Sequence, residues 1–116
     1  IYYFRDVFDR PCEQLEHDMK LWWVHDEAII STLLAYYITK EEKYLNWYKK
    51  VKKYAFAHFG DKEFGEWYGY LHRDGTVSHT QKGSLWKGPY HLPRCLILTS
   101  KILKGIIYDS DKLELL

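Results

Sequence analysis

The stretch LWWVHDEAIISTLLAYYI, residues 21–38, decides the fold of this chain. Its apolar side chains recur at intervals of three and four positions, which is the spacing along one face of an α-helix. They are Trp22, Ile29, Ile30, Leu33, Leu34 and Tyr37. The spacing predicts a helix from about Leu21 to Ile38.

A second helix is predicted immediately afterwards. Residues 39–42, Thr-Lys-Glu-Glu, have the form of a capping box, in which a Thr hydroxyl and a Glu carboxylate bind free amides at a helix start. Beyond them one face is apolar and the other carries lysines. The apolar residues are Tyr44, Trp47, Tyr48, Val51, Tyr54 and Ala55. Gly60 suits the C-terminal cap, so two antiparallel helices are expected in close succession.

The second half of the chain predicts a β-hairpin and a last helix. Residues 66–72 and 76–78 resemble strands, and the Asp74-Gly75 pair between them is a strong hairpin signal. Residues 82–89 form a loop, and Pro93 suits the first turn of a helix that runs to about Tyr108. Residues 1–5 are rich in aromatic and β-branched side chains and predict a short strand.

The order helix, helix, hairpin, helix predicts an all-α fold with an inserted β-hairpin. It suits an α/α barrel, in which helical hairpins form two concentric rings and long loops at one end build the site. The predicted helices are too few to close such a ring. The chain also begins with Ile1 rather than Met, and its first strand has no obvious partner, so an upstream part is expected to be missing.

Composition argues against several classes of protein. The 116 residues suit one compact domain, and 17 basic against 16 acidic side chains leave almost no net charge to attract nucleic acid or an anionic membrane. No apolar run approaches the roughly 20 residues that span a bilayer. Cys12 and Cys95 do not suggest a disulfide framework, which predicts a cytoplasmic protein with reduced thiols.

The start of the first helix carries residue types that can bind a sugar. Trp23 and Glu27 are four residues apart and share a helix face, so a sugar ring stacked on the indole could also be hydrogen-bonded by the carboxylate. The alternative is that Trp22 and Trp23 are both core residues, and that Asp26 and Glu27 merely favour the helix N-terminus through its dipole.

The loop before the last helix carries the second group of candidates. His91 could act as a general acid or base, because imidazole exchanges protons near neutral pH. The alternative is a histidine that caps or packs. Trp86 could be a stacking platform and Arg94 could hold a carboxylate, but each residue type is also common in purely structural positions. The other hairpin and helix-end histidines, His58, His72 and His79, are interpreted as structural.

Other reaction classes lack their motifs. His17, His25 and Asp26 do not have the spacing of metal ligands, so no metal is expected to be required. The sequence contains no phosphate-binding glycine loop and no nucleophile elbow. A glycoside hydrolase would need two opposed carboxylates, and only Glu27 is a convincing candidate.

Three motifs, in order, resemble those of the N-acylglucosamine 2-epimerase family. Residues 14–27 are similar to its tryptophan-rich motif, and residues 64–75 are similar to its hairpin. Residues 82–94 contain Lys-Gly, Trp-Lys-Gly and His-Leu-Pro-Arg, similar to its lysine-glycine and histidine-proline-arginine signature. The resemblance implies the C-terminal portion of an (α/α)6 barrel, with residues 1–116 forming roughly the last third of one domain.

The resemblance also implies a reaction. It is the reversible inversion of C2 between N-acetylglucosamine and N-acetylmannosamine, by removal of a proton and its return on the other face. His91 and Glu27 would be the catalytic residues. The substrate-binding residues would be Trp23, Trp86, Lys87 and Arg94. The family's second catalytic histidine and its N-terminal arginine are absent, so this segment alone is expected to be inactive.

Substrate and partners are less specified by the resemblance. His17 differs from the residue most common at this position of the family's motif. Residues 84–85 and 89–90 also differ, and they resemble the corresponding residues of cellobiose 2-epimerases. A cellobiose 2-epimerase, an aldose-ketose isomerase of the same barrel family or a non-catalytic binding fragment therefore remain alternatives. The expected partners are a small-molecule sugar and, for the full-length protein, a second copy in a homodimer. No cofactor is expected to be required, with ATP or another nucleotide as an allosteric effector.

Overall fold

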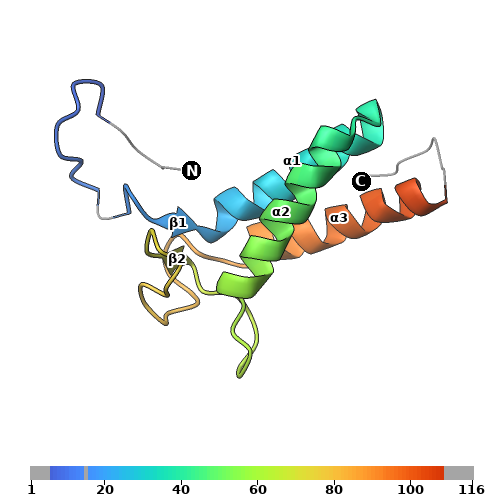
Figure 1. Ribbon diagram of the computed structural model, residues 1–116. Helices are drawn as coiled ribbons and strands as arrows, with labels where there is room; N and C mark the ends of the chain where they lie inside the picture. Colours follow the sequence, from blue (N-terminus) through green and yellow to red (C-terminus); the bar gives the residue numbers. More distant parts are fainter. Residues whose placement is uncertain (1–5, 15, 109–116) are drawn as a thin grey trace.

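The computed structural model describes residues 6–14 and 16–108, and most of them are helical (Figure 1). The elements are β1 (Lys20–Leu21), α1 (Trp22–Thr39), α2 (Glu42–His58), β2 (Tyr70–Leu71) and α3 (His91–Ile107). The three predicted helices are therefore confirmed. The strand predicted at residues 1–5 lies outside the described residues. None of the described helices combines the length and the apolar character needed to cross a membrane.

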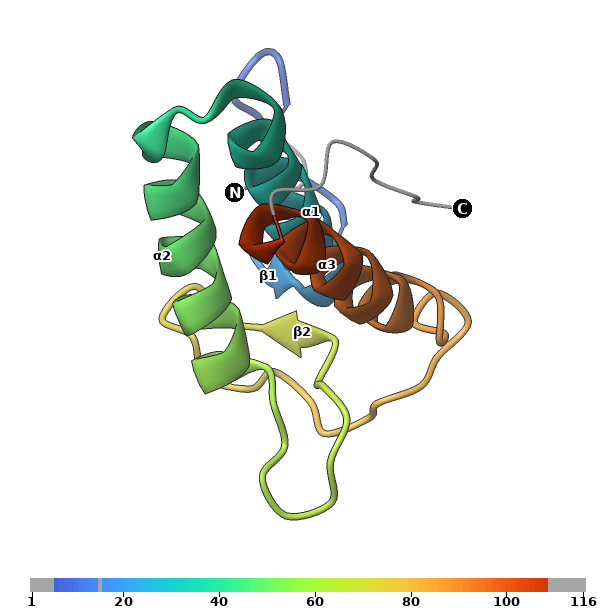
Figure 2. The same cartoon turned by 90° about the vertical axis from the view of Figure 1, so that its right-hand side faces the viewer.

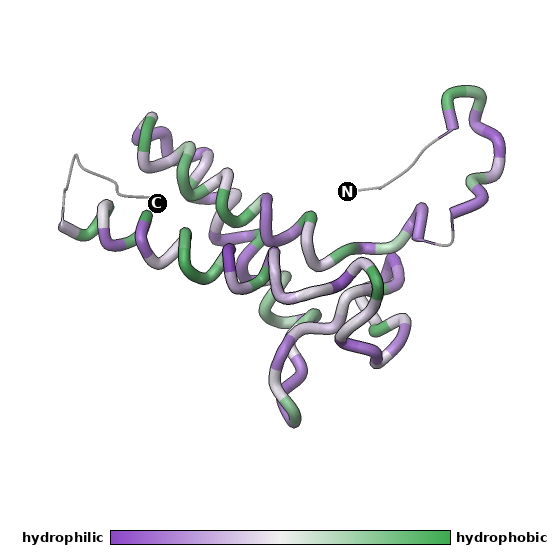
Figure 3. Tube along the Cα trace, turned by 180° about the vertical axis from the view of Figure 1, so that it is seen from behind, coloured by the Kyte–Doolittle hydropathy of each residue, from purple (hydrophilic) through white to green (hydrophobic). Residues whose placement is uncertain are grey.

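Helix α1 is the centre of the structure, because it packs against both α2 and α3. Figure 2 shows α2 and α3 on different sides of α1, and Figure 3 shows hydrophobic residues recurring along all three helices. Leu33 of α1, Phe59 at the end of α2 and Ile102 of α3 are fully buried together. The predicted stripe of residues 21–38 is thus the core face of the molecule.

The junction between α1 and α2 corrects the predicted capping box. Thr39 is the last residue of α1, and its hydroxyl donates to the carbonyl of Ala35 (2.8 Å) and accepts from the amide of Glu41 (3.2 Å). Lys40 follows in the left-handed conformation (φ 57°). The N-cap of α2 is Glu41, which makes no side-chain capping bond. The prediction was wrong because the threonine closes the first helix instead of opening the second.

The structure also corrects the prediction that Gly60 caps the C-terminus of α2. The C-cap of α2 is Phe59, in the ordinary right-handed conformation, and Gly60 forms an isolated β-bridge with Trp67. Phe59 stacks on Trp67, with ring centroids 5.7 Å apart. The chain leaves the helix along these contacts, without the left-handed glycine that commonly ends a helix.

The predicted hairpin is present, and the structure adds its partner. Leu71 forms a bridge with Val77, and the amide of His72 donates to the carbonyl of Thr76 (2.8 Å) across the turn. β2 pairs antiparallel with β1, with Lys20 opposite Leu71. The hairpin is therefore fastened to the start of α1, and Figure 1 shows both at the end of the molecule where α3 begins.

Gly75 makes the turn possible, and its replacement is expected to destabilise the protein. Its φ of 96° lies in the left-handed region, and a Cβ atom there would approach both the His58 ring and the Tyr54 hydroxyl to 2.8 Å. Gly75→Ala should lower the free energy of unfolding by about 1–3 kcal/mol. Gly83→Ala is the matched control, because nothing lies within 4 Å of its Cβ position. Equal unfolding midpoints for the two variants would contradict this account of the turn.

Candidate active site

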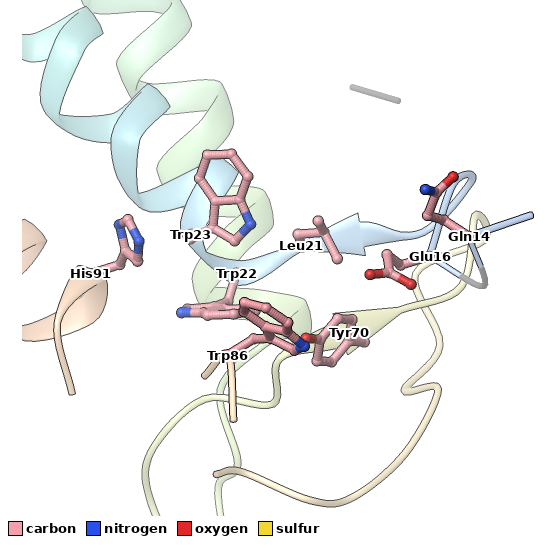
Figure 4. A pocket seen from close by; sticks show the side chains of 8 residues that line it. All are labelled: Gln14, Glu16, Leu21, Trp22, Trp23, Tyr70, Trp86 and His91. Atoms are coloured by element: carbon pink, nitrogen blue, oxygen red, sulfur yellow. The ribbon is translucent and has the colours of Figure 1, made fainter. Parts of the chain in front are cut away.

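A pocket of about 400 Å³ opens where β1 and the start of α1 meet the hairpin and the start of α3 (Figure 4). Aromatic side chains from three parts of the chain form most of its wall. The lining residues are Gln14, Glu16, Leu21, Trp22, Trp23, Tyr70, Trp86 and His91. This combination of flat apolar rings with a few polar groups is typical of a site for a small polar molecule such as a sugar.

His91 is held in place by Glu27. The Nδ1 atom of the imidazole lies 3.0 Å from Oε1 of Glu27, which also accepts a hydrogen bond from the Arg94 guanidinium. His91 is the first residue of α3 and Arg94 lies one turn later, so both face the same point of α1. Because His91 and Arg94 lie one turn apart at the start of α3, the single carboxylate of Glu27 can bind both of them.

The bond between Glu27 and His91 assigns a role to each ring nitrogen. Burial opposes ionisation of Glu27, but hydrogen bonds from Arg94 and His91 outweigh it and lower the pKa of the carboxyl group. A carboxylate accepts a hydrogen bond from the N–H at Nδ1 of a neutral imidazole, which leaves the lone pair on Nε2. His91 also lines the pocket, so it has the arrangement of a general base that is oriented by an acid.

The two adjacent tryptophans have different environments. Trp22 is buried, with 3% of its surface exposed, and its amide donates to the carbonyl of Gly69 (3.0 Å). Trp23 is half-buried, and its ring centroid lies 5.7 Å from that of His91. The core interpretation therefore holds for Trp22, while Trp23 stands beside the imidazole at the pocket.

Trp86 stands at the rim on the loop before α3, and its side chain is 77% exposed. The next residue, Lys87, is buried and forms an ion pair with Glu66 (2.5 Å). Earlier in the loop, Lys82 pairs with Asp61 and donates to the carbonyl of Gly65 (2.7 Å). Two buried or half-buried lysines thus fix the loop and leave its tryptophan open to solvent.

The structure brings together five of the six predicted site residues. Trp23, Trp86 and His91 line the pocket. Glu27 binds the His91 imidazole, and Arg94 binds Glu27. Lys87 differs, because its ammonium lies behind Trp22, 5.8 Å from the ring centroid, and is already paired. Its predicted contact with substrate stays a prediction.

Six further contributors were not predicted as site residues: Gln14, Glu16, Leu21, Trp22, Tyr70 and Glu66. Tyr70 follows from strand geometry, because neighbouring strand residues face opposite sides and Leu71 is the fully buried one. Glu66 has no such signal, since its partner lies on a separate loop. Within the residues that the structure describes, no group of three His, Cys, Asp or Glu side chains is placed to hold a metal ion.

The Lys82–Asp61 pair predicts how the loop responds to pH. The Lys82 ammonium, together with the amides of Glu63 and Phe64, lowers the pKa of Asp61. Its contribution to stability is therefore present above the ordinary aspartate pKa of about 3.9 and is lost as pH falls through the lower pKa of the folded state. Asp61→Asn should lower the melting temperature at pH 7 and have progressively less effect below pH 4. An effect that grows on acidification would contradict the assignment.

Most of the chain matches a known protein family. Residues 1–95 match the family model described as N-acylglucosamine 2-epimerase (GlcNAc 2-epimerase). Over 107 residues the chain is 43% identical to the N-acylglucosamine 2-epimerase of Rattus norvegicus, covering 92% of this chain and 26% of that protein. The Homo sapiens protein of the same name is 40% identical, with 92% and 25% covered. The chain spans about a quarter of the length of these relatives.

Cellobiose 2-epimerases are also similar. The Ruminococcus albus enzyme is 37% identical over 75 residues, which covers 62% of this chain and 19% of that protein. The solved structure of the cellobiose 2-epimerase from Spirochaeta thermophila superposes with a TM-score of 0.72 at 29% identity, covering 79% of this chain and 23% of the other. The Bacillus thermoamylovorans enzyme gives 0.65 at 30% identity, covering 78% and 23%. The helical arrangement is that of part of these epimerase structures.

Proposed function

The chain belongs to the N-acylglucosamine 2-epimerase family, and on that premise we propose that the full-length protein interconverts N-acetylglucosamine and N-acetylmannosamine. The observation that carries the proposal is the pocket with His91 in its wall and Glu27 and Arg94 behind it. In the complete domain this segment forms the C-terminal part of an (α/α)6 barrel, with the pocket at the end where its loops gather.

The reaction inverts the configuration at C2 by removing a proton from one face and adding a proton to the other. With the sugar ring open, Nε2 of His91 takes the proton from C2 beside the carbonyl, and the electron pair passes to the carbonyl oxygen as an enolate. A proton delivered to the opposite face of C2 then gives the epimer. That delivery requires a second acid. The family resemblance assigns that delivery to a histidine of a motif that residues 1–116 lack, so the second group is proposed to lie outside this segment and the segment alone to be inactive.

The remaining site residues hold the substrate and the base. Trp23 and Trp86 flank the sugar, because indole faces pack against the C–H surfaces of a ring. Glu27 keeps the proton of His91 on Nδ1, and Arg94 keeps Glu27 ionised. Lys87 acts from behind Trp22 by fixing the loop that carries Trp86.

Isotope exchange in heavy water tests the proposal. The full-length protein is incubated with N-acetylmannosamine in D₂O and followed by NMR. We expect deuterium at C2 of both sugars together with the appearance of N-acetylglucosamine. Epimerisation without deuterium at C2 would argue against proton transfer, and no reaction of the folded protein would reject this substrate.

The second candidate function is that of a cellobiose 2-epimerase. The observation in its favour is Trp86, whose 77% exposed indole stands at the rim as a platform for a second sugar unit. A panel of N-acetylglucosamine, N-acetylmannosamine, cellobiose, glucose and mannose, compared by kcat/KM, separates the two enzymes and the aldose-ketose isomerases. A preference for cellobiose by tenfold or more would replace the first proposal with the second.

Regulation and assembly belong to the same proposal. The full-length protein is proposed to act as a homodimer in the cytoplasm, with no required cofactor and with ATP or another nucleotide as an effector. Sedimentation with and without ATP, together with the kcat measured in both conditions, tests assembly and effector separately.

A further inference from the structure

Asp26 lies one residue before Glu27 on α1 and is fully buried, with none of its surface exposed. Within residues 6–14 and 16–108, neither of its carboxyl oxygens makes a hydrogen bond of standard geometry. A buried carboxylate without such bonds is unfavourable, because burial removes the water that stabilises its charge. Burial accordingly raises the pKa of Asp26 to about 7. Below that pH the group is a neutral acid.

The group facing Asp26 from α3 is the thiol of Cys95, which is also buried. Burial and the nearby Asp26 raise the pKa of Cys95 to about 12, so the thiol keeps its proton. A neutral carboxyl group can donate as well as accept, and a thiol does both weakly. A neutral pair therefore packs in the core at little electrostatic cost, whereas an ionised Asp26 does not.

This pair lies directly beside the contacts that hold His91. Asp26 precedes Glu27 on α1, and Cys95 follows Arg94 on α3. The Asp26–Cys95 contact and the Glu27–Arg94 bond thus cross between the same two helices, one residue apart on each. Any force that separates Asp26 from α3 also acts on Glu27 and its partners.

We propose that Asp26, fully buried against Cys95, is a positioning residue that keeps Glu27 aligned with His91 and Arg94. The proposal rests on the function proposed for His91. The charged groups facing Asp26 are Glu27 on its own helix and the Lys87–Glu66 pair on the packed loops. When Asp26 loses its proton, it adds a third negative charge beside Glu27 and Glu66. The one ammonium nearby, that of Lys87, is already paired with Glu66. The resulting repulsion loosens α1 from α3.

The kcat of the full-length protein against pH tests the role of the proton. An acid with a pKa of about 7 goes from roughly nine-tenths neutral at pH 6 to roughly one-tenth at pH 8. Asp26→Asn cannot ionise, so the ratio of its kcat to that of the parent should rise about tenfold over this range, with KM unchanged. Glu63→Gln, which replaces an exposed carboxylate away from the pocket, is the control and should keep the parent's profile. Superimposable profiles for Asp26→Asn and the parent overturn the proposal.

Stability against pH gives a second readout that does not depend on activity. The pKa of Asp26 is higher in the folded protein than in the unfolded chain, so its stabilising contribution is complete below about pH 4 and is lost as pH rises towards 7. Relative to Asp26→Asn, the unfolding constant of the parent should rise by up to about tenfold per pH unit in that window. Asp61→Asn should differ from the parent by a constant amount over this window, because the contribution of Asp61 is lost only below about pH 4. A constant difference between parent and Asp26→Asn from pH 4 to 7 counts against the proposal.

Two further measurements cover the remaining outcomes. If Asp26→Asn does not fold, Cys95→Ala is used instead, because it removes the contact that lowers the pKa of Asp26. The loss of kcat at alkaline pH should then move to higher pH. A pH profile that does not move overturns the proposal. If no sugar is turned over, the ¹⁵N NMR signals of the His91 ring decide. A change near pH 7 that is absent in Asp26→Asn supports positioning while the proposed function fails, and identical titrations reject the positioning role.

Discussion

Replacing His91 with alanine in the full-length protein is expected to lower kcat by about 10²–10⁴-fold, the usual contribution of a positioned acid or base. The ring lines the pocket and is oriented by Glu27 at 3.0 Å, so in the proposed reaction its loss removes proton transfer on one face of C2. The effect should appear in the same ratio in deuterium exchange at C2 and in formation of the epimer. Both are measured by NMR in D₂O.

His72→Ala is the matched control, because His72 is an exposed hairpin histidine that does not line the pocket. Its kcat should stay within about twofold of the parent, as expected for surface substitutions away from a site. Retention of exchange by His91→Ala, with folding intact, would transfer the proton chemistry to another residue.

Glu27→Gln is expected to lower kcat by about 10²-fold or more, approaching the roughly 10⁴-fold loss known when a histidine-orienting aspartate becomes asparagine. The amide can donate to Nδ1 and so favour the wrong tautomer of His91, and it leaves Arg94 without its anionic partner. Initial rates across a range of substrate concentrations should show the loss in kcat. Glu63→Gln, on the exposed loop after α2, should behave as the parent.

A loss confined to KM would give Glu27 a different role. It would mean that the carboxylate binds the sugar hydroxyls, which was the other function open to it from the sequence. Arg94→Lys separates the two roles further, since lysine keeps the charge beside Glu27 but lacks the planar group that can bond in two places. A drop in kcat for both variants indicates orientation of the imidazole.

The three helices were predictable because each carries a local signal. The stripe in residues 21–38 and the placement of Pro93 depend only on neighbouring residues, and so does the Asp74-Gly75 turn. β1 was not predictable, because a two-residue strand has no periodicity and its partner is far along the chain. The capping box failed for a related reason: Thr39 can end one helix as readily as it can begin the next, and only the backbone of Lys40 decides between them.

For the site, the residue types were predictable and their contacts were not. His91 and Glu27 were selected separately, and nothing in their spacing shows that they meet across 64 positions. The stripe placed Trp22 on the core face and left the position of Trp23 open, because adjacent helical residues can both be buried, as Ile29 and Ile30 are. The pairing of Lys87 with Glu66 depends on how two loops pack.

The short ladder between β1 and β2 has a consequence for the order of folding. Helices α1 and α2 are neighbours along the chain and form from local contacts, whereas pairing Leu21 with Tyr70 requires closure of a long loop. The wall that contains Trp22 and Tyr70 is therefore expected to assemble after the helical hairpin and to open before it. In native-state hydrogen exchange, the Trp22 amide, bonded to Gly69, should lose protection under milder conditions than the amides in the middle of α1.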